Sequence, residues 1–136
     1  MNPVVQEEMT GCGVACVATL ARVPYGKVKT VATEMGIATH DSKLWSDTNY
    51  VRKLCAQFNI KLSKTQNPFL GWDTLPNRAL LAIKWHIEDG APFWHWAVFN
   101  RKKKGSYVLD PKKGLKANKR TDFGKIKPKW FIEVYF

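Results

Sequence analysis

The first 60 residues carry apolar side chains at helical spacing. This spacing predicts three helices, over residues 11–21, 25–35 and 47–58. The first begins near Thr10 or Gly11, is small and apolar on nearly every side, and must end before Pro24. We therefore expect it to be buried. Asp47 is the expected N-cap of the third helix, and the polar residues 39–46 before it predict a loop.

From about residue 79 onward, the pattern changes to short runs of branched and aromatic side chains, which are typical of strands. These runs predict four strands, over residues 79–85, 92–100, 106–109 and 130–135. A charged turn over 100–105 makes the second and third strands an antiparallel hairpin, and residues 67–77, with two prolines and a glycine, predict a connecting loop. Helices followed by an antiparallel sheet define an α+β fold. Because 136 residues is a common domain size, we expect one domain over 1–136.

Cys12 stands in the first turn of the predicted buried helix. A helix N-terminus and a neighbouring imidazolium both stabilise the thiolate, which is the nucleophilic form of cysteine. We expect Gly11 and Gly13 to let the backbone turn sharply and to let a substrate carbonyl approach the Cys12 N–H. The side-chain amide of Gln6 can donate a second hydrogen bond to an oxyanion. The alternative interpretation of Cys12 is a small, buried core residue.

His95 lies within an apolar predicted strand, with Trp94 and Trp96 expected on one face and His95 on the other. Asp110 ends the next strand, so an antiparallel hairpin brings the two side chains together. An acid there would hold the imidazole ring by its Nδ1–H and support the imidazolium. The alternatives are a hydrogen-bonded core histidine and an Asp110-Pro111 pair that only ends a strand.

Three segments together resemble the sequence motifs of the C39 peptidase family, which belongs to the papain-like cysteine proteases. The first has Gln, five residues and then Cys-Gly, the second is a His that opens an apolar strand, and the third is an apolar strand that ends in Asp-Pro. They are QEEMTGCGVAC over 6–16, HWAVF over 95–99 and YVLDP over 107–111. The resemblance implies a papain-like fold, with N-terminal helices packed on a C-terminal antiparallel sheet.

The same resemblance implies a role for each matched residue. Gln6 would be the oxyanion-hole donor, Cys12 the nucleophile, His95 the general base and then acid, and Asp110 the residue that orients His95. The implied activity is that of a stand-alone C39-like cysteine peptidase or related amide hydrolase, which acts on a peptide or protein and needs no cofactor. Transamidation, deamidation and thioester cleavage use the same catalytic groups, so the sequence does not separate these reactions from hydrolysis.

The net charge of +11 is concentrated at the C-terminal end of the chain. Residues 101–136 carry twelve Lys/Arg and three Asp/Glu, a net charge of +9, whereas residues 1–100 carry only +2. This asymmetry gives a second hypothesis, a catalytically silent papain-fold binding protein that holds an acidic partner such as nucleic acid. The simplest alternative is a solvated set of lysine-rich loops.

The three cysteines, Cys12, Cys16 and Cys55, are an odd number, and the N-terminus lacks the pattern of a secretory signal. These features predict a reduced, cytoplasmic protein without a disulfide framework. Cys12 and Cys16 have no second ligand pair at a matching spacing, so we expect no metal site. We expect no membrane span, because no apolar run reaches about 18 residues.

Overall fold

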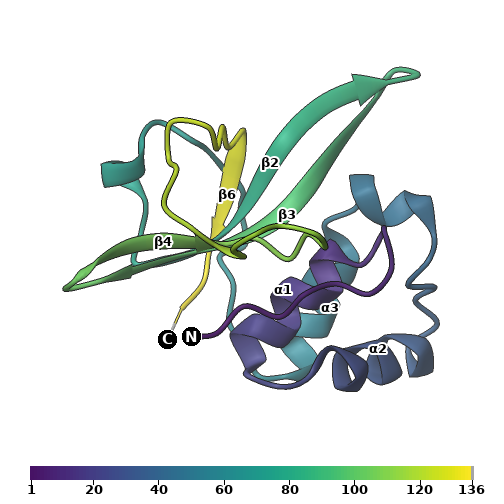
Figure 1. Cartoon of the computed structure of the whole chain (residues 1–136). Helices are drawn as coiled ribbons and strands as arrows, with labels where there is room; N and C mark the ends of the chain where they lie inside the picture. Colours follow the sequence, from purple (N-terminus) through teal and green to yellow (C-terminus); the bar gives the residue numbers. More distant parts are fainter. Residues whose placement is uncertain (136) are drawn as a thin grey trace.

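The computed structural model describes residues 1–135 and consists of three helices packed on one antiparallel sheet (Figure 1). The helices are α1 (Cys12–Ala21), α2 (Tyr25–Glu34) and α3 (Asn49–Gln57), with short 3-10 turns at η1 (Ser42–Ser46) and η2 (Trp72–Thr74). The strands are β1 (Asn67–Pro68), β2 (Arg78–Glu88), β3 (Ala91–Lys102), β4 (Gly105–Leu109), β5 (Lys119–Arg120) and β6 (Trp130–Glu133). Their order in the sheet is β1-β6-β2-β3-β4-β5. This architecture confirms the predicted α+β fold.

The helices predicted from apolar spacing are confirmed to within a few residues at each end. The third helix begins later than predicted, because Thr48 is its N-cap and Asp47 instead accepts a hydrogen bond from the Asn49 N–H at 2.8 Å. Strand β2 is longer than predicted and runs to Glu88, so His86 lies on the strand rather than after it. Two-residue strands, β1 and β5, occur where only loops were expected.

Helix α1 lies at the centre of the core, between the sheet and the other two helices (Figure 1). Cys12 through Leu20 are all buried, as the apolar sequence predicts. The sheet meets this helix with a cluster of indole rings from Trp94, Trp96 and Trp130, whose centroids lie 5.1 to 5.8 Å apart in edge-to-face pairs. Such pairs add to the stabilisation that burial of apolar area already provides. The start of α1 is therefore held rigidly against the sheet.

The two glycines that flank Cys12 are required by the packing around the start of α1. A turn does end at Gly11, whose N–H donates to Glu8 O at 3.0 Å, but neither Gly11 nor Gly13 has a positive φ, so the turn does not require glycine. A Cβ on Gly11 would overlap the Tyr25 hydroxyl, and a Cβ on Gly13 would overlap the Tyr50 hydroxyl. The glycines are needed because two tyrosine side chains occupy the space that a methyl group would fill.

An opening in the sheet lies where β4 leaves β3. The β3–β4 pairing runs from Lys102 with Gly105 to Val98 with Leu109 and stops there. His95 is beyond the last pair, so its strand has no β4 partner at that point. Asp110 directly follows Leu109 and therefore extends toward His95. This divergence of two strands brings a histidine and an aspartate together beside the start of α1.

Candidate active site

Cys12 is the first residue of α1 and therefore lies in the first turn, as predicted. It is 0% exposed. No side chain caps the start of the helix. The first N–H groups of a helix have no partner within the helix, so they are available to stabilise a negative charge. The thiol therefore stands at a helix end that favours a thiolate, but it is covered in this structure.

His95 and Asp110 form a direct ion pair in which His95 Nε2 lies 2.7 Å from Asp110 Oδ1. Because an ionised carboxylate only accepts hydrogen bonds, Nε2 must carry a proton and donate it to Oδ1. The expectation that Asp110 holds Nδ1 is thus wrong, and the ring is bound through its other nitrogen. The Cys12 side chain is next to the ring and contributes to the raised pKa of His95. Since Nε2 is occupied, Nδ1 is the nitrogen that is available to the thiol.

The pair shifts the pKa of both partners toward the charged forms. Burial alone would lower the pKa of His95, but the hydrogen bond to Asp110 and the adjacent Cys12 side chain raise it to about 9. Burial alone would raise the pKa of Asp110, but the hydrogen bond and charge of His95, with the Lys112 N–H and Arg120, lower it to about 2. An imidazolium therefore faces the Cys12 thiol at neutral pH.

Arg120 is a further member of this cluster that the sequence analysis did not identify. Its Nη1 donates to Asp110 Oδ2 at 2.9 Å, while its Nε and Nη2 bind the two carboxylate oxygens of Asp122 at 2.9 and 2.8 Å. The Lys112 N–H donates to Asp110 Oδ1 at 3.0 Å. Asp110 is 0% exposed and is thus held by donors on both oxygens. The only signal in the sequence was that Arg120 lies in the basic C-terminal quarter.

Gln6 is buried close to the start of α1, but its amide already has partners. Its Nε2 donates to the backbone carbonyls of Glu8 and Met9, both at 3.0 Å, and its Oε1 is buried without a hydrogen-bond partner. The Gln6 backbone N–H donates to Pro111 O at 2.9 Å, which ties this segment to the end of β4. An oxyanion-hole role for Gln6 therefore requires Nε2 to release at least one of these carbonyls.

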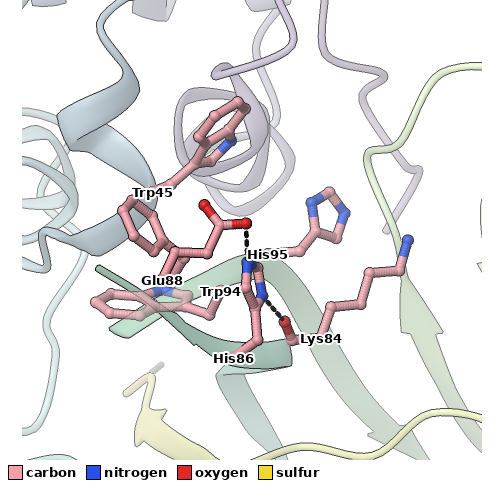
Figure 2. A pocket seen from close by; sticks show the side chains of 7 residues that line it. Trp45, Lys84, His86, Glu88, Trp94 and His95 are labelled. Carbon is pink, nitrogen blue, oxygen red and sulfur yellow. Dashed lines mark hydrogen bonds and ion pairs between the residues drawn. The ribbon is translucent and has the colours of Figure 1, made fainter. Parts of the chain in front are cut away.

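Two cavities meet at His95, and both are also lined by Trp45 and Lys84. One cavity, of about 290 Å³, has a largely aromatic wall that includes Trp94 and continues along the β2–β3 hairpin (Figure 2). The other, of about 390 Å³, lies beside the segment 6–9 and Lys112. Together they form a groove through the His95 site, and grooves with aromatic walls and a few polar groups suit the binding of organic ligands.

The edge of the aromatic cavity is fixed by a polar network on β2. In Figure 2, the His86 ring joins two neighbours, with Nδ1 2.9 Å from Lys84 O and Nε2 3.3 Å from Glu88 Oε1. His86 is exposed and also lines this cavity. Within residues 1–135, no group of three or more His, Cys, Asp or Glu side chains is arranged to hold a metal ion.

Three helices on an antiparallel sheet, with a cysteine at a helix start and a histidine on the facing strand, define a papain-like cysteine protease fold. The model of the Peptidase C39 family matches residues 1–130, so this chain belongs to the C39 peptidase family. The resemblance seen in the sequence motifs is thereby confirmed. Among the described residues, none of the helices combines the length and the apolar character needed to cross a membrane.

A solved structure with the same fold is a double glycine motif protease from an AMS/PCAT transporter, in complex with the leader peptide. The two chains align with a TM-score of 0.60 and 18% identity, over 98% of this chain and 89% of that one. This likeness confirms the predicted papain-like architecture of helices packed on an antiparallel sheet. No curated protein matches the chain.

Proposed function

We propose that this protein is a cysteine peptidase in which Cys12 is the nucleophile, His95 the acid and base, and Asp110 the residue that orients His95. The observation that carries the proposal is the 2.7 Å ion pair between His95 and Asp110, which leaves the other ring nitrogen for Cys12. Family membership supports the same conclusion, since C39 is a peptidase family. The structural neighbour binds a leader peptide, which supports a peptide substrate here.

The proposed reaction has two stages. The Cys12 thiolate attacks a carbonyl carbon of the substrate, the C–N bond breaks, and the Nδ1 proton of His95 passes to the leaving amine. Neutral His95 then takes a proton from water, and the resulting hydroxide attacks the thioester. The thiolate leaves, the acid product forms, and His95 is again protonated. Through both stages Asp110 stays ionised and fixes the ring.

The oxyanion of each tetrahedral intermediate needs hydrogen-bond donors at the start of α1. We propose the Cys12 N–H, which has no partner within the helix, and Gln6 Nε2. For the second donor to act, the amide must turn away from the Glu8 or Met9 carbonyl, both of which it now holds at 3.0 Å. Because Cys12 is 0% exposed, substrate binding must also displace neighbouring groups to reach the thiol. We infer that both changes occur in the segment 6–10.

A second candidate function is a non-catalytic binding domain on the same fold. The buried thiol and the occupied Gln6 amide favour it, because a binder has no need to expose Cys12 or to free Nε2. The intact His95–Asp110 pair favours the peptidase, because a charged imidazolium beside a thiol serves catalysis and is not needed for binding alone.

The test is incubation with a peptide library that includes both Gly-Gly sequences and mixed sequences, with product termini identified by mass spectrometry. The peptidase proposal predicts cleavage that is lost in Cys12→Ala and falls by about a thousandfold or more in His95→Ala. Cys16→Ala is the matched control, since Cys16 lies one turn along the same helix and should leave cleavage intact. Cleavage that persists in Cys12→Ala, or no cleavage of any peptide, would contradict the proposal.

A further inference from the structure

Lys84 lies at the junction of three cavities. It lines the two cavities that meet at His95, and it also lines a third cavity of about 520 Å³ beside the segment 125–129. The third cavity is basic, because its wall also contains three lysines of the segment 125–129. Arg120 lines it as well, but its charge is paired with Asp110 and Asp122. No Asp or Glu lines this third cavity among the residues that the structure describes. Lys84 thus links the candidate active site to a cavity whose wall carries lysine side chains.

The backbone at Lys84 is shaped to present this side chain. The β2–β3 register shifts between Ile83 and His86, which marks a β-bulge, and Lys84 has a φ of 53°. A lysine in this left-handed region is uncommon and costs about 1 kcal/mol or more. Bulges beside functional sites often redirect one side chain. In Figure 2 the Lys84 side chain extends along the edge of the pocket toward the His95 ring.

Lys84 and Lys112 both line the cavity that contains His95 and the segment 6–9. Burial and the adjacent Lys112 ammonium lower the pKa of Lys84, which indicates that the two side chains repel each other when both are charged. The Asp110 carboxylate acts on Lys84 in the opposite direction, but it is already bound by His95 and Arg120. Of the other carboxylates on the cavities at His95, Glu8 is paired with Lys29 and Glu88 with His86, while Glu7 lines the same cavity as Lys112 and Lys113. An incoming carboxylate would relieve the repulsion between the two lysines.

We propose that Lys84 and Lys112 form a carboxylate-binding subsite beside the reacting bond, extended by the lysines of residues 125–129, which selects peptide substrates with acidic side chains. This inference rests on the proposed peptidase function and names a substrate class for it. Electrostatic complementarity of this kind chiefly sets specificity and the rate of association.

An acidic peptide fits this surface better than a nucleic acid does. Binding of single-stranded nucleic acid normally needs open aromatic faces on which bases stack. Trp85, the aromatic residue on the basic cavity, has the Lys129 ammonium over its ring at 4.5 Å, so that face is covered. The basic surface also leads directly to His95, where an extended peptide chain would pass.

The test uses the Cys12→Ala protein and fluorescent ten-residue peptides that differ only in Glu against Gln at alternate positions. We expect the Glu peptide to bind more tightly at low salt, with an affinity that falls about fivefold in Lys84→Asn and in Lys112→Gln. Asn is chosen because it tolerates a left-handed φ. Lys103→Asn is the matched control, because this exposed lysine lies in the β3–β4 turn, at the far end of the sheet from the start of α1 (Figure 1).

Equal affinity for both peptides, or no effect of Lys84→Asn and Lys112→Gln, would overturn the inference. Tighter binding of a single-stranded oligonucleotide that Lys84→Asn abolishes would also overturn it, in favour of nucleic acid. Values of kcat/KM for the same peptides in the wild-type protein separate this inference from the peptidase proposal. If the Glu and Gln peptides are cleaved with the same kcat/KM, the proposed subsite is wrong and the peptidase proposal stands. If the Glu peptide binds more tightly but neither peptide is cleaved, the peptidase proposal is wrong.

Discussion

The residue on which the site depends most is Asp110. It is wholly buried, yet it is ionised, because His95, Arg120 and the Lys112 N–H supply hydrogen bonds to its two oxygens. A buried carboxylate with several charged partners is strongly fixed in position. Its orientation in turn fixes the His95 ring, so that one nitrogen faces the carboxylate and the other is free for the thiol. We infer that Arg120 is a positioning residue that acts through Asp110.

Arg120→Gln should lower kcat/KM about tenfold, equivalent to roughly 1.4 kcal/mol of transition-state stabilisation. Removal of a positive charge raises the pKa of nearby groups, so both limbs of the pH–rate profile should move to higher pH. Asp122→Asn is the control, since it removes the other partner of Arg120 but keeps the contact with Asp110. A loss of activity with no movement of the pH profile would mean that Arg120 only supports the fold.

At the level of elements, the start of α1 depends on close contact with α3. A Cβ on Gly13 would overlap the Tyr50 hydroxyl and lie 2.9 Å from Val51 Cγ2, both in a packed interior. Gly13→Ala should therefore destabilise the protein by about 1–3 kcal/mol, the usual cost of overpacking, despite the higher helix propensity of alanine. Urea denaturation measures this change in the free energy of unfolding.

Gly26→Ala is the comparison, because Gly26 lies in α2 with nothing within 4 Å of the added methyl group. This variant should be unchanged or stabilised by up to about 1 kcal/mol. Equal stabilisation by both substitutions would show that Gly13 is not constrained by Tyr50.

For the whole molecule, the His95–Asp110 pair makes stability depend on pH. The pKa of His95 is raised from 6.5 to about 9, so its contribution is fully present below pH 6.5 and is lost as pH rises through about 9. The pKa of Asp110 is lowered from 3.8 to about 2, so its contribution is present above 3.8 and is lost as pH falls through about 2.

The difference in unfolding free energy between the wild type and His95→Gln should thus be largest between pH 4 and 6.5 and should shrink above pH 9. Chemical denaturation across this range gives the measurement, and His86→Gln, at an exposed histidine, is the control. A difference that does not vary with pH would contradict the ion pair.

The fold was predictable where the local pattern decides it. The helices show apolar spacing or an apolar run that ends before Pro24, and the four longer strands show runs of branched and aromatic side chains. The short strand β5 has no such signal, since its two residues pair only because β4 is already in place. That pairing brings Arg120 to Asp110, so Arg120 could not be recognised from the sequence. The choice of Nε2 over Nδ1 was missed for a similar reason, because it depends on how β3 and β4 diverge. The burial of Cys12, by contrast, agrees with the apolar character of the sequence around it.

The most direct test of the account is the rate of alkylation of each cysteine by iodoacetamide as a function of pH, followed by peptide mass spectrometry. Cys16 and Cys55 are internal controls, because burial raises the pKa of Cys16 well above its usual value and that of Cys55 to about 12. We infer that the segment 6–10 also opens without substrate and lets a small reagent reach Cys12. We therefore predict that Cys12 reacts first, that it still reacts below about pH 7, and that this reactivity is lost in His95→Ala. If Cys12 reacts no faster than Cys16 and Cys55, and no differently in His95→Ala, the thiol is an ordinary buried residue and the proposed peptidase function is wrong.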